Sequence, residues 1–150
     1  MTLDQRSAPL PQWLGPVPAP QQDYAPFWAR LREHQLSIQR CQVCGRWIHY
    51  PCGACPECSG SALEFEPVSG DGHLYTYTVV HREFGLNLSI PWVAAFVDLV
   101  EQPGLRVATN IVNCAPDELE IGMPVHVVYA DYANDVTLAY FEPTLTGGAR

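Results

Sequence analysis

Four cysteines in this sequence have the spacing of a tetrahedral metal site. Cys41 and Cys44 form one Cys-x-x-Cys pair, Cys55 and Cys58 form a second, and ten residues lie between the pairs. A Cys-x-x-Cys turn directs two thiolates at one ion, and two such turns supply the four sulfur ligands of a zinc site. Because four protein ligands leave no position for water, the Zn²⁺ that we expect here is structural.

Two other side chains compete for this site. Cys52 and Cys55 are also spaced as Cys-x-x-Cys, and His49 offers an imidazole. We favour Cys55 with Cys58, because Cys-Pro-Glu-Cys-Ser-Gly repeats the turn chemistry of the first pair. The alternative pairing would leave Cys58 without a role. A glycine shortly after each pair fits a reversing turn, since glycine takes positive φ at little cost.

Disulfides are the other possible use of these cysteines, as in small secreted domains. Residues 1–20 do not have the basic start and apolar run of a signal peptide. We therefore expect a cytoplasmic protein with reduced thiols bound to zinc. Cys114, far along the chain from the other cysteines, is expected to be a buried or inert thiol.

Composition and charge exclude several classes of function. With 150 residues and 47% hydrophobic content, the chain can form one ordinary domain, or a small metal module beside one. No apolar run approaches the ~20 residues that span a bilayer, so no membrane partner is expected. The formal net charge of −8 argues against nucleic acid, which requires a basic face.

The sequence before the cysteines divides into two segments. Residues 1–22 are rich in proline and are expected to form an extended arm. Trp13 in this arm either belongs to an unordered leader or docks on a partner or on the chain itself. Residues 23–37 are expected to form an amphipathic helix with Asp23 as its N-cap and with Pro26 in the first turn. Phe27, Trp28 and Leu31 recur at helical spacing and form one apolar stripe.

The remaining sequence predicts a mainly β fold. Residues 38–65 should form the zinc ribbon, with Trp47, Ile48 and Tyr50 in its strand pair; its small core implies that metal binding supplies much of its folding energy. Residues 66–145 contain five strand-like segments: those at 74–80, 105–111, 125–129 and 136–140 alternate with period two, and that at 92–100 is more continuously apolar. One helical turn is expected at 115–119, before the fourth strand. This order fits a five-stranded OB-fold barrel, and a small open sandwich is the alternative.

The order of these parts resembles a known family. The two cysteine pairs are followed by Gly70-x-Gly72-x-Leu74, then by Pro91-Trp92-x-Ala94 and Ile121-Gly122-Met123-x-Val125. This combination resembles the acyl-CoA-associated family in which a rubredoxin-like zinc ribbon is fused to an OB fold, the group called domain of unknown function thirty-five. The resemblance covers roughly residues 23–143.

The resemblance implies a non-catalytic subunit. Members of this family accompany thiolases, acyltransferases and lipid-transfer-protein-like aldolases that act on acyl-CoA thioesters, including steroid side-chain intermediates. The subunit is expected to complete the CoA or acyl channel of its partner. Arg82 is one of few cations on the barrel, and we expect it either to lie near the CoA phosphates or to be solvated.

No enzyme motif stands out in the sequence. His73 and His81 flank the first barrel strand, but no serine or cysteine nucleophile motif accompanies them. A second hypothesis is a protein that binds single-stranded nucleic acid by stacking bases on Tyr75, Tyr77 and Phe84. A third is a free-standing carrier of acyl-CoA.

Overall fold

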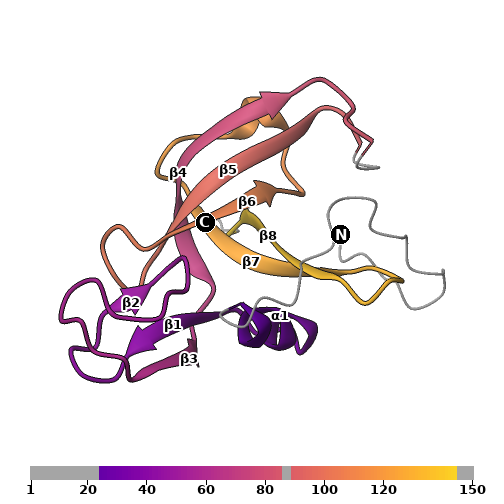
Figure 1. Ribbon diagram of the computed structural model, residues 1–150. Coiled ribbons are helices and arrows are strands. Elements are labelled where there is room, and N and C mark those ends of the chain that lie inside the picture. The colour runs from indigo at the N-terminus through magenta and orange to yellow at the C-terminus, as the bar shows by residue number, and fades with distance from the viewer. Residues whose placement is uncertain (1–23, 86–88, 145–150) are drawn as a thin grey trace.

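The computed structural model describes residues 24–85 and 89–144. The proline-rich arm expected at 1–22 lies outside these residues, as does Asp23. In the described chain a short helix precedes a small three-stranded sheet, and a five-stranded barrel follows (Figure 1). The expectation of a mainly β fold with a zinc ribbon and a closed OB barrel is confirmed. No helix among the described residues is long and apolar enough to cross a membrane.

Helix α1 runs from Ala25 to Arg32 and is shorter than the 23–37 segment that we expected. Pro26 occupies the first turn, where an N–H group would have no partner within the helix. The helix ends because His34 adopts a positive φ of 56°, which directs its backbone N–H back to the carbonyl of Leu31 at 2.9 Å. Ser37, the expected last residue of the helix, instead begins the first strand.

The small sheet contains β1 (Ser37–Cys41), β2 (Trp47–Ile48) and β3 (Leu63–Pro67) in the order β2-β1-β3. All its neighbours are antiparallel, and β1 pairs with β3 along its whole length. The central strand thus ends at Cys41, the first of the four cysteines. We expected the ribbon strands to lie between the two Cys-x-x-Cys turns, but only β2 lies there. Tyr50 is exposed and lies outside β2.

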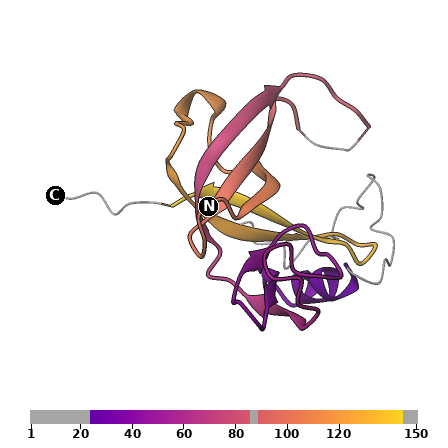
Figure 2. The same ribbon diagram turned by 60° about the vertical axis from the view of Figure 1, so that its left-hand side comes forward.

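The barrel contains β4 (Asp71–Val80), β5 (Trp92–Leu99), β6 (Arg106–Ile111), β7 (Pro124–Asp131) and β8 (Thr137–Pro143). It closes in the order β4-β5-β6-β8-β7, and the 3-10 turn Pro116–Glu118 lies before its fourth strand. The seam between β6 and β8 is parallel and has a single registered pair, Ile111 with Phe141. The β4–β5 hairpin extends beyond the barrel, and the ribbon sheet lies below it (Figures 1 and 2).

Two glycines at the start of β4 explain the Gly-x-Gly string of the sequence. Gly70 has a φ of +83°, a conformation that side chains rarely adopt. Gly72 lies so close to β5 that a Cβ atom there would come within 2.5 Å of the Val97 side chain and 2.7 Å of the Asp98 carbonyl oxygen. The barrel can therefore close at this point only with a residue that has no side chain.

Ribbon and barrel share one hydrophobic core. Leu31, Leu36 and Ile38, which come from α1 and the start of β1, belong to the same buried cluster as the inward residues of the barrel. Two polar contacts reinforce this junction: the Tyr129 hydroxyl accepts the Leu36 N–H at 2.8 Å, and His34 Nε2 lies 2.7 Å from Asp131 Oδ2. The helix is thus fixed to the barrel wall and not only to the ribbon.

The ribbon has a much smaller core of its own. It contains Cys41, Ile48 and Cys55, with Cys52 and Leu63 packed against it. So few apolar side chains cannot offset the conformational entropy of the ribbon loops, which is roughly 1–2 kcal/mol per ordered residue. The ribbon therefore depends on the barrel on one side and on its cysteine cluster on the other.

Candidate metal centre and partner surface

The structure brings Cys41, Cys44, Cys55 and Cys58 together, so that their four sulfur atoms all lie within 4.8 Å of one another. The Cys41–Cys58 and Cys44–Cys55 sulfur distances are both 3.6 Å. A disulfide requires about 2.05 Å, so these sulfurs are not bonded to each other. In a tetrahedron with zinc–sulfur bonds of about 2.3 Å, neighbouring sulfurs are about 3.8 Å apart. The four cysteines thus form a cluster whose geometry could hold such an ion.

Two similar backbone turns present these thiols. The Gly45 N–H donates to the Cys41 carbonyl, and the Ser59 N–H donates to the Cys55 carbonyl, both at 2.8 Å. Gly45 and Ser59 have φ values of 77° and 61°, so the residue directly after each pair takes the positive φ.

Our expectation that glycine serves this role in both turns holds for Gly45 but is wrong for the second turn, where the residue is Ser59. Gly60 has a different role: a Cβ atom at Gly60 would come within 3.2 Å of the Cys58 sulfur.

The first turn also favours a thiolate at Cys41. The backbone N–H of Cys44 donates to the Cys41 sulfur and lowers the pKa of this thiol to about 6, although burial acts in the opposite direction. A thiolate, and not a thiol, is the form that binds metal. The backbone of the first turn therefore favours the thiolate form of Cys41.

The two competing side chains lie outside the cluster. The Cys52 thiol donates to the Ala54 carbonyl at 3.0 Å, and its backbone N–H donates to the Gln39 side chain at 2.9 Å. The ring of His49 lies beside Phe27, with a centroid distance of 6.1 Å. Cys114 is partly buried and lies in the loop after β6, where its thiol donates to the Ala115 carbonyl. Neither Cys52 nor His49 is among the clustered ligands.

Arg82 lies far from the four cysteines along the chain, two residues after the end of β4 in the loop of the β4–β5 hairpin. Its guanidinium is 5.7 Å from the ring centroid of Phe84. Phe84 and Ile90 in the same loop are 59% and 51% exposed, which is high for large apolar side chains. We call Arg82, Phe84 and Ile90 the hairpin tip. A cation beside exposed apolar side chains is typical of a surface that binds a partner.

The three aromatic residues considered for base stacking do not form one free platform. Tyr75 is covered by the Arg106 guanidinium, 3.3 Å from the ring centroid. Tyr77 is partly buried and its hydroxyl donates to the Leu119 carbonyl. Phe84 is 59% exposed and lies at the hairpin tip, away from the other two rings in the sequence, with the Arg82 guanidinium 5.7 Å from its ring centroid.

Comparison with known proteins identifies both modules. Residues 28–64 match the model of the rubredoxin-like zinc ribbon domain of ChsH2, and residues 65–130 match that of the C-terminal OB-fold domain of ChsH2. A solved chain of the Ltp2–ChsH2(DUF35) aldolase superposes with a TM-score of 0.79 at 35% identity, over 85% of this chain and 98% of that chain.

Two curated relatives place the chain further. A probable enoyl-CoA hydratase alpha subunit of Thermomonospora curvata is 36% identical over 90% of this chain, but the chain spans only 42% of that relative. A DUF35 domain-containing scaffold protein of Methanocaldococcus jannaschii is 36% identical, over 72% of this chain and 77% of the relative. The family expected from the cysteine pairs and the strings that follow them is confirmed, and the chain belongs to the DUF35 family.

Proposed function

We propose that this chain is a non-catalytic subunit that docks on a thiolase-like enzyme acting on acyl-CoA thioesters. The observation that carries the proposal is its likeness to the DUF35 chain of the Ltp2–ChsH2 aldolase, which extends over 98% of that chain. The thioester class is supported by a relative that is named an enoyl-CoA hydratase subunit. Steroid side-chain thioesters are the substrates that the family resemblance favours.

The described residues support an accessory role for three reasons. The four clustered cysteines leave no ligand position for a substrate. The histidines near the ends of β4 have no serine or cysteine nucleophile motif beside them in the sequence. The hairpin tip presents exposed Phe84 and Ile90, whose apolar surface is available to a partner.

We propose that zinc is the ion held by the four cysteines and that it acts only in folding. Soft thiolates at tetrahedral spacing select zinc over the oxygen-preferring cations. Thiols that stay reduced for metal binding also suit a cytoplasmic location, which is part of the proposal. Arg82 is the side chain that we propose near the CoA phosphates, because its guanidinium lies at the exposed end of the β4–β5 hairpin.

Co-expression with an Ltp2-type thiolase-like enzyme, followed by size-exclusion chromatography, tests the proposal. The two chains are expected to elute together, and the enzyme is expected to be less soluble when expressed without this chain. In a matched experiment the same enzyme is co-expressed with the Cys41→Ser variant, which should fail to form a complex with it. Separate elution of the two wild-type chains, with unchanged solubility of the enzyme, would exclude the proposed role.

A further inference from the structure

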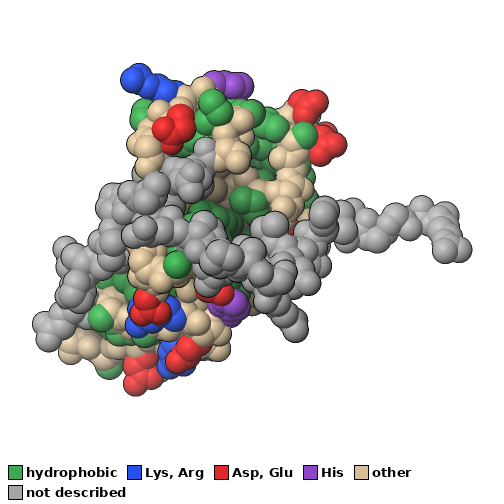
Figure 3. Space-filling view, turned by 90° about the vertical axis from the view of Figure 1, so that its right-hand side faces the viewer, with side chains coloured by type: hydrophobic (Ala, Val, Ile, Leu, Met, Phe, Trp, Pro, Cys, Tyr) green, Lys and Arg blue, Asp and Glu red, His purple; other side chains and the backbone are tan. Residues whose placement is uncertain are grey.

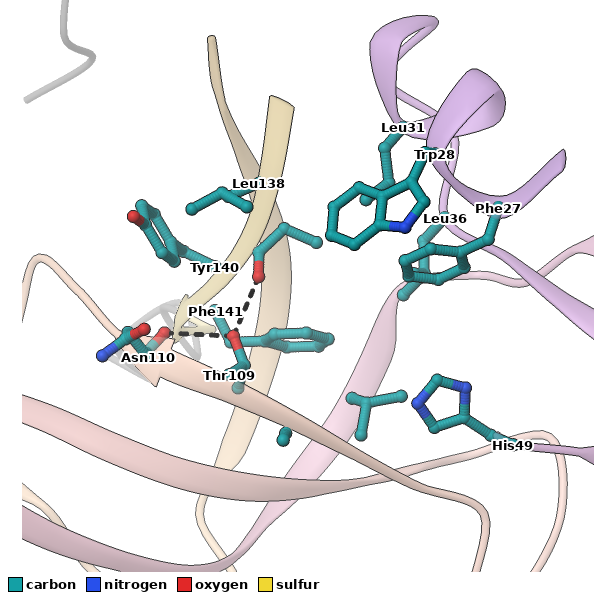
Figure 4. A pocket seen from close by; sticks show the side chains of 13 residues that line it. Phe27, Trp28, Leu31, Leu36, His49, Thr109, Asn110, Leu138, Tyr140 and Phe141 are labelled. Atoms are coloured by element: carbon teal, nitrogen blue, oxygen red, sulfur yellow. Dashed lines mark hydrogen bonds between the residues drawn. The ribbon is translucent and has the colours of Figure 1, made fainter. Parts of the chain in front are cut away.

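A cavity of about 160 Å³ lies where helix α1 meets the barrel, next to the parallel seam between β6 and β8 (Figure 4). We call it the junction pocket. Figure 4 shows Phe27, Trp28 and Leu31 of α1 on one side and Leu138 and Tyr140 of β8 on the other. The metal site does not contribute to this pocket, and neither does the hairpin tip.

Several polar groups around the junction pocket are engaged in hydrogen bonds within the chain. The Thr109 hydroxyl donates to the Ala139 carbonyl at 2.9 Å, and the Asn110 amide donates to the Val93 carbonyl at 3.0 Å. The Tyr140 hydroxyl is hydrogen bonded to that of Tyr132 at 2.8 Å. The ring of His49 is directed at the cavity and has no hydrogen-bond partner among residues 24–85 and 89–144 (Figure 4). The pocket is therefore largely apolar, and His49 offers it a ring without a hydrogen-bond partner in the described chain.

The ring of His49 provides a hydrogen-bond acceptor. Burial lowers the pKa of His49 to about 4, so its ring is neutral near pH 7. A neutral imidazole carries one N–H donor and one nitrogen that accepts. The pocket can thus bind an apolar group that has one N–H or O–H at its edge, because that N–H or O–H can donate to the imidazole nitrogen.

The size of the pocket restricts what it holds. An apolar cavity of about 150 Å³ in another protein accommodates one benzene molecule. The junction pocket, at about 160 Å³, therefore has room for roughly one aromatic side chain. A steroid nucleus or the nucleotide part of CoA is much larger than this. The pocket is then not the place where the proposed enzyme complex binds its whole substrate.

The chain itself carries a suitable group close to the pocket. Trp13 is the single aromatic residue among the 23 that precede the described chain. The described chain starts at Tyr24, directly before α1, and Phe27 and Trp28 in the first turn of that helix line the pocket. The eleven residues from Trp13 to Tyr24 can reach roughly 34 Å at about 3.1 Å per residue, which is ample for this distance.

We propose that the indole of Trp13 occupies the junction pocket and donates its N–H to the ring of His49. Indole is a large apolar group with a single donor, which matches a largely apolar cavity that offers an acceptor on the His49 ring. Pro16, Pro18 and Pro20 lie between Trp13 and the helix, and they reduce the entropy lost when the segment is ordered. The docked arm would fasten α1 against β6 and β8, where the barrel has only one registered pair.

Methyl-labelled NMR of the zinc-loaded full chain tests this inference. Nuclear Overhauser effects are expected between the Trp13 ring and the methyl groups of Leu36 and Leu138, two residues that line the pocket. Trp13→Ala should abolish these effects and shift both methyl resonances. Leu3→Ala, in the same preceding segment, is the matched control and should leave them in place.

Two further variants test the hydrogen bond. Trp13→Phe should keep most of the methyl shifts, because the ring remains. His49→Phe should increase the exchange rate of the Trp13 indole N–H by roughly tenfold, as expected for one lost hydrogen bond. Methyl resonances of Leu36 and Leu138 that are identical in wild type and Trp13→Ala would overturn the inference. The inference would also be overturned if added hexanoate, a small apolar probe, shifted these methyl resonances in the wild type but the Trp13→Ala substitution left them unchanged.

Discussion

The side-chain amide of Gln102 makes two hydrogen bonds with the backbone of Trp47. Its oxygen accepts the Trp47 N–H at 3.0 Å, and its nitrogen donates to the Trp47 carbonyl at 3.1 Å. Gln102 lies in the turn between β5 and β6, whereas Trp47 begins the outer strand of the ribbon. A barrel turn thus continues the hydrogen bonding of the ribbon sheet, and the two modules are coupled at a second place besides α1.

Replacing Gln102 with alanine should weaken this coupling. The backbone groups of Trp47 lose two partners, and each lost hydrogen bond costs about 1 kcal/mol, so the free energy of unfolding should fall by roughly 2 kcal/mol. Urea denaturation of the zinc-loaded chain measures this change. Gln42→Ala removes an exposed amide from the same ribbon and should change the stability by well under 1 kcal/mol. Equal effects of the two substitutions would show that Gln102 does not couple the modules.

This coupling marks the limit of what the sequence could predict. Cysteine spacing and period-two alternation are local signals, and they predicted the ribbon, the five strands and the short helical turn between the third and fourth strands. The contact between Gln102 and Trp47 could not be predicted, because the two residues lie 55 positions apart in the chain. The junction pocket was missed for the same reason, since its walls come from α1, the ribbon and two barrel strands.

Two local errors have clear physical causes. The helix was expected to continue to about Ser37, but the positive φ of His34 ends it, and the ring of His34 stacks on Tyr129 with 5.1 Å between centroids. This tertiary contact cannot be seen in helical periodicity. The second cysteine turn was expected to use glycine for its positive φ, whereas Ser59 adopts it. Gly60 is needed instead for its close approach to the Cys58 sulfur.

Stability should fall in acid partly because of His49. Its pKa is about 4 in the folded chain and about 6.5 in the unfolded chain. Between these values the unfolded chain binds the proton and the folded chain does not, so stability is full above about pH 6.5 and falls as the pH decreases towards 4. The total loss is roughly 3 kcal/mol, and about 1 kcal/mol of it occurs by pH 5.5.

The change is measured as the difference in unfolding free energy between pH 7 and pH 5.5, with excess zinc present at both values. His49→Phe should reduce this difference by about 1 kcal/mol, while the contributions of the other histidines remain. The same pH dependence in wild type and variant would mean that the imidazole is protonated with similar ease in the folded and unfolded chains.

Removing one sulfur ligand should unfold the ribbon. Cys41→Ser leaves three thiolates, and the small ribbon core has little else to hold its loops. We expect loss of bound zinc by mass spectrometry of metals, and exchange-labile amides in residues 41–60. Cys114→Ser, outside the cluster, is the matched control and should keep one ion per chain. Full zinc content in Cys41→Ser would show that the ligand set is wrong, and Cys52 would then be the first residue to reconsider.

The hairpin tip should contribute to assembly with the partner. Phe84→Ser removes an exposed apolar side chain and should leave stability nearly unchanged, but it should weaken the complex by roughly tenfold or more if Phe84 is an anchor of the interface. Val100→Ser is the control, because Val100 is 52% exposed at the opposite end of β5. Affinities come from titration of the thiolase-like enzyme with each variant. If both variants bind as the wild type does, another surface forms the interface.

Turnover of an acyl-CoA thioester, measured for this chain alone, for the thiolase-like enzyme alone and for their complex, tests the central claim most directly. We expect no turnover by this chain alone at any zinc content. We expect kcat/KM to be at least about tenfold higher for the complex than for the enzyme alone, the effect of about 1.4 kcal/mol of additional transition-state stabilisation. Turnover by the isolated chain, or equal kcat/KM with and without it, would contradict the assignment of a non-catalytic subunit that completes the site of its partner.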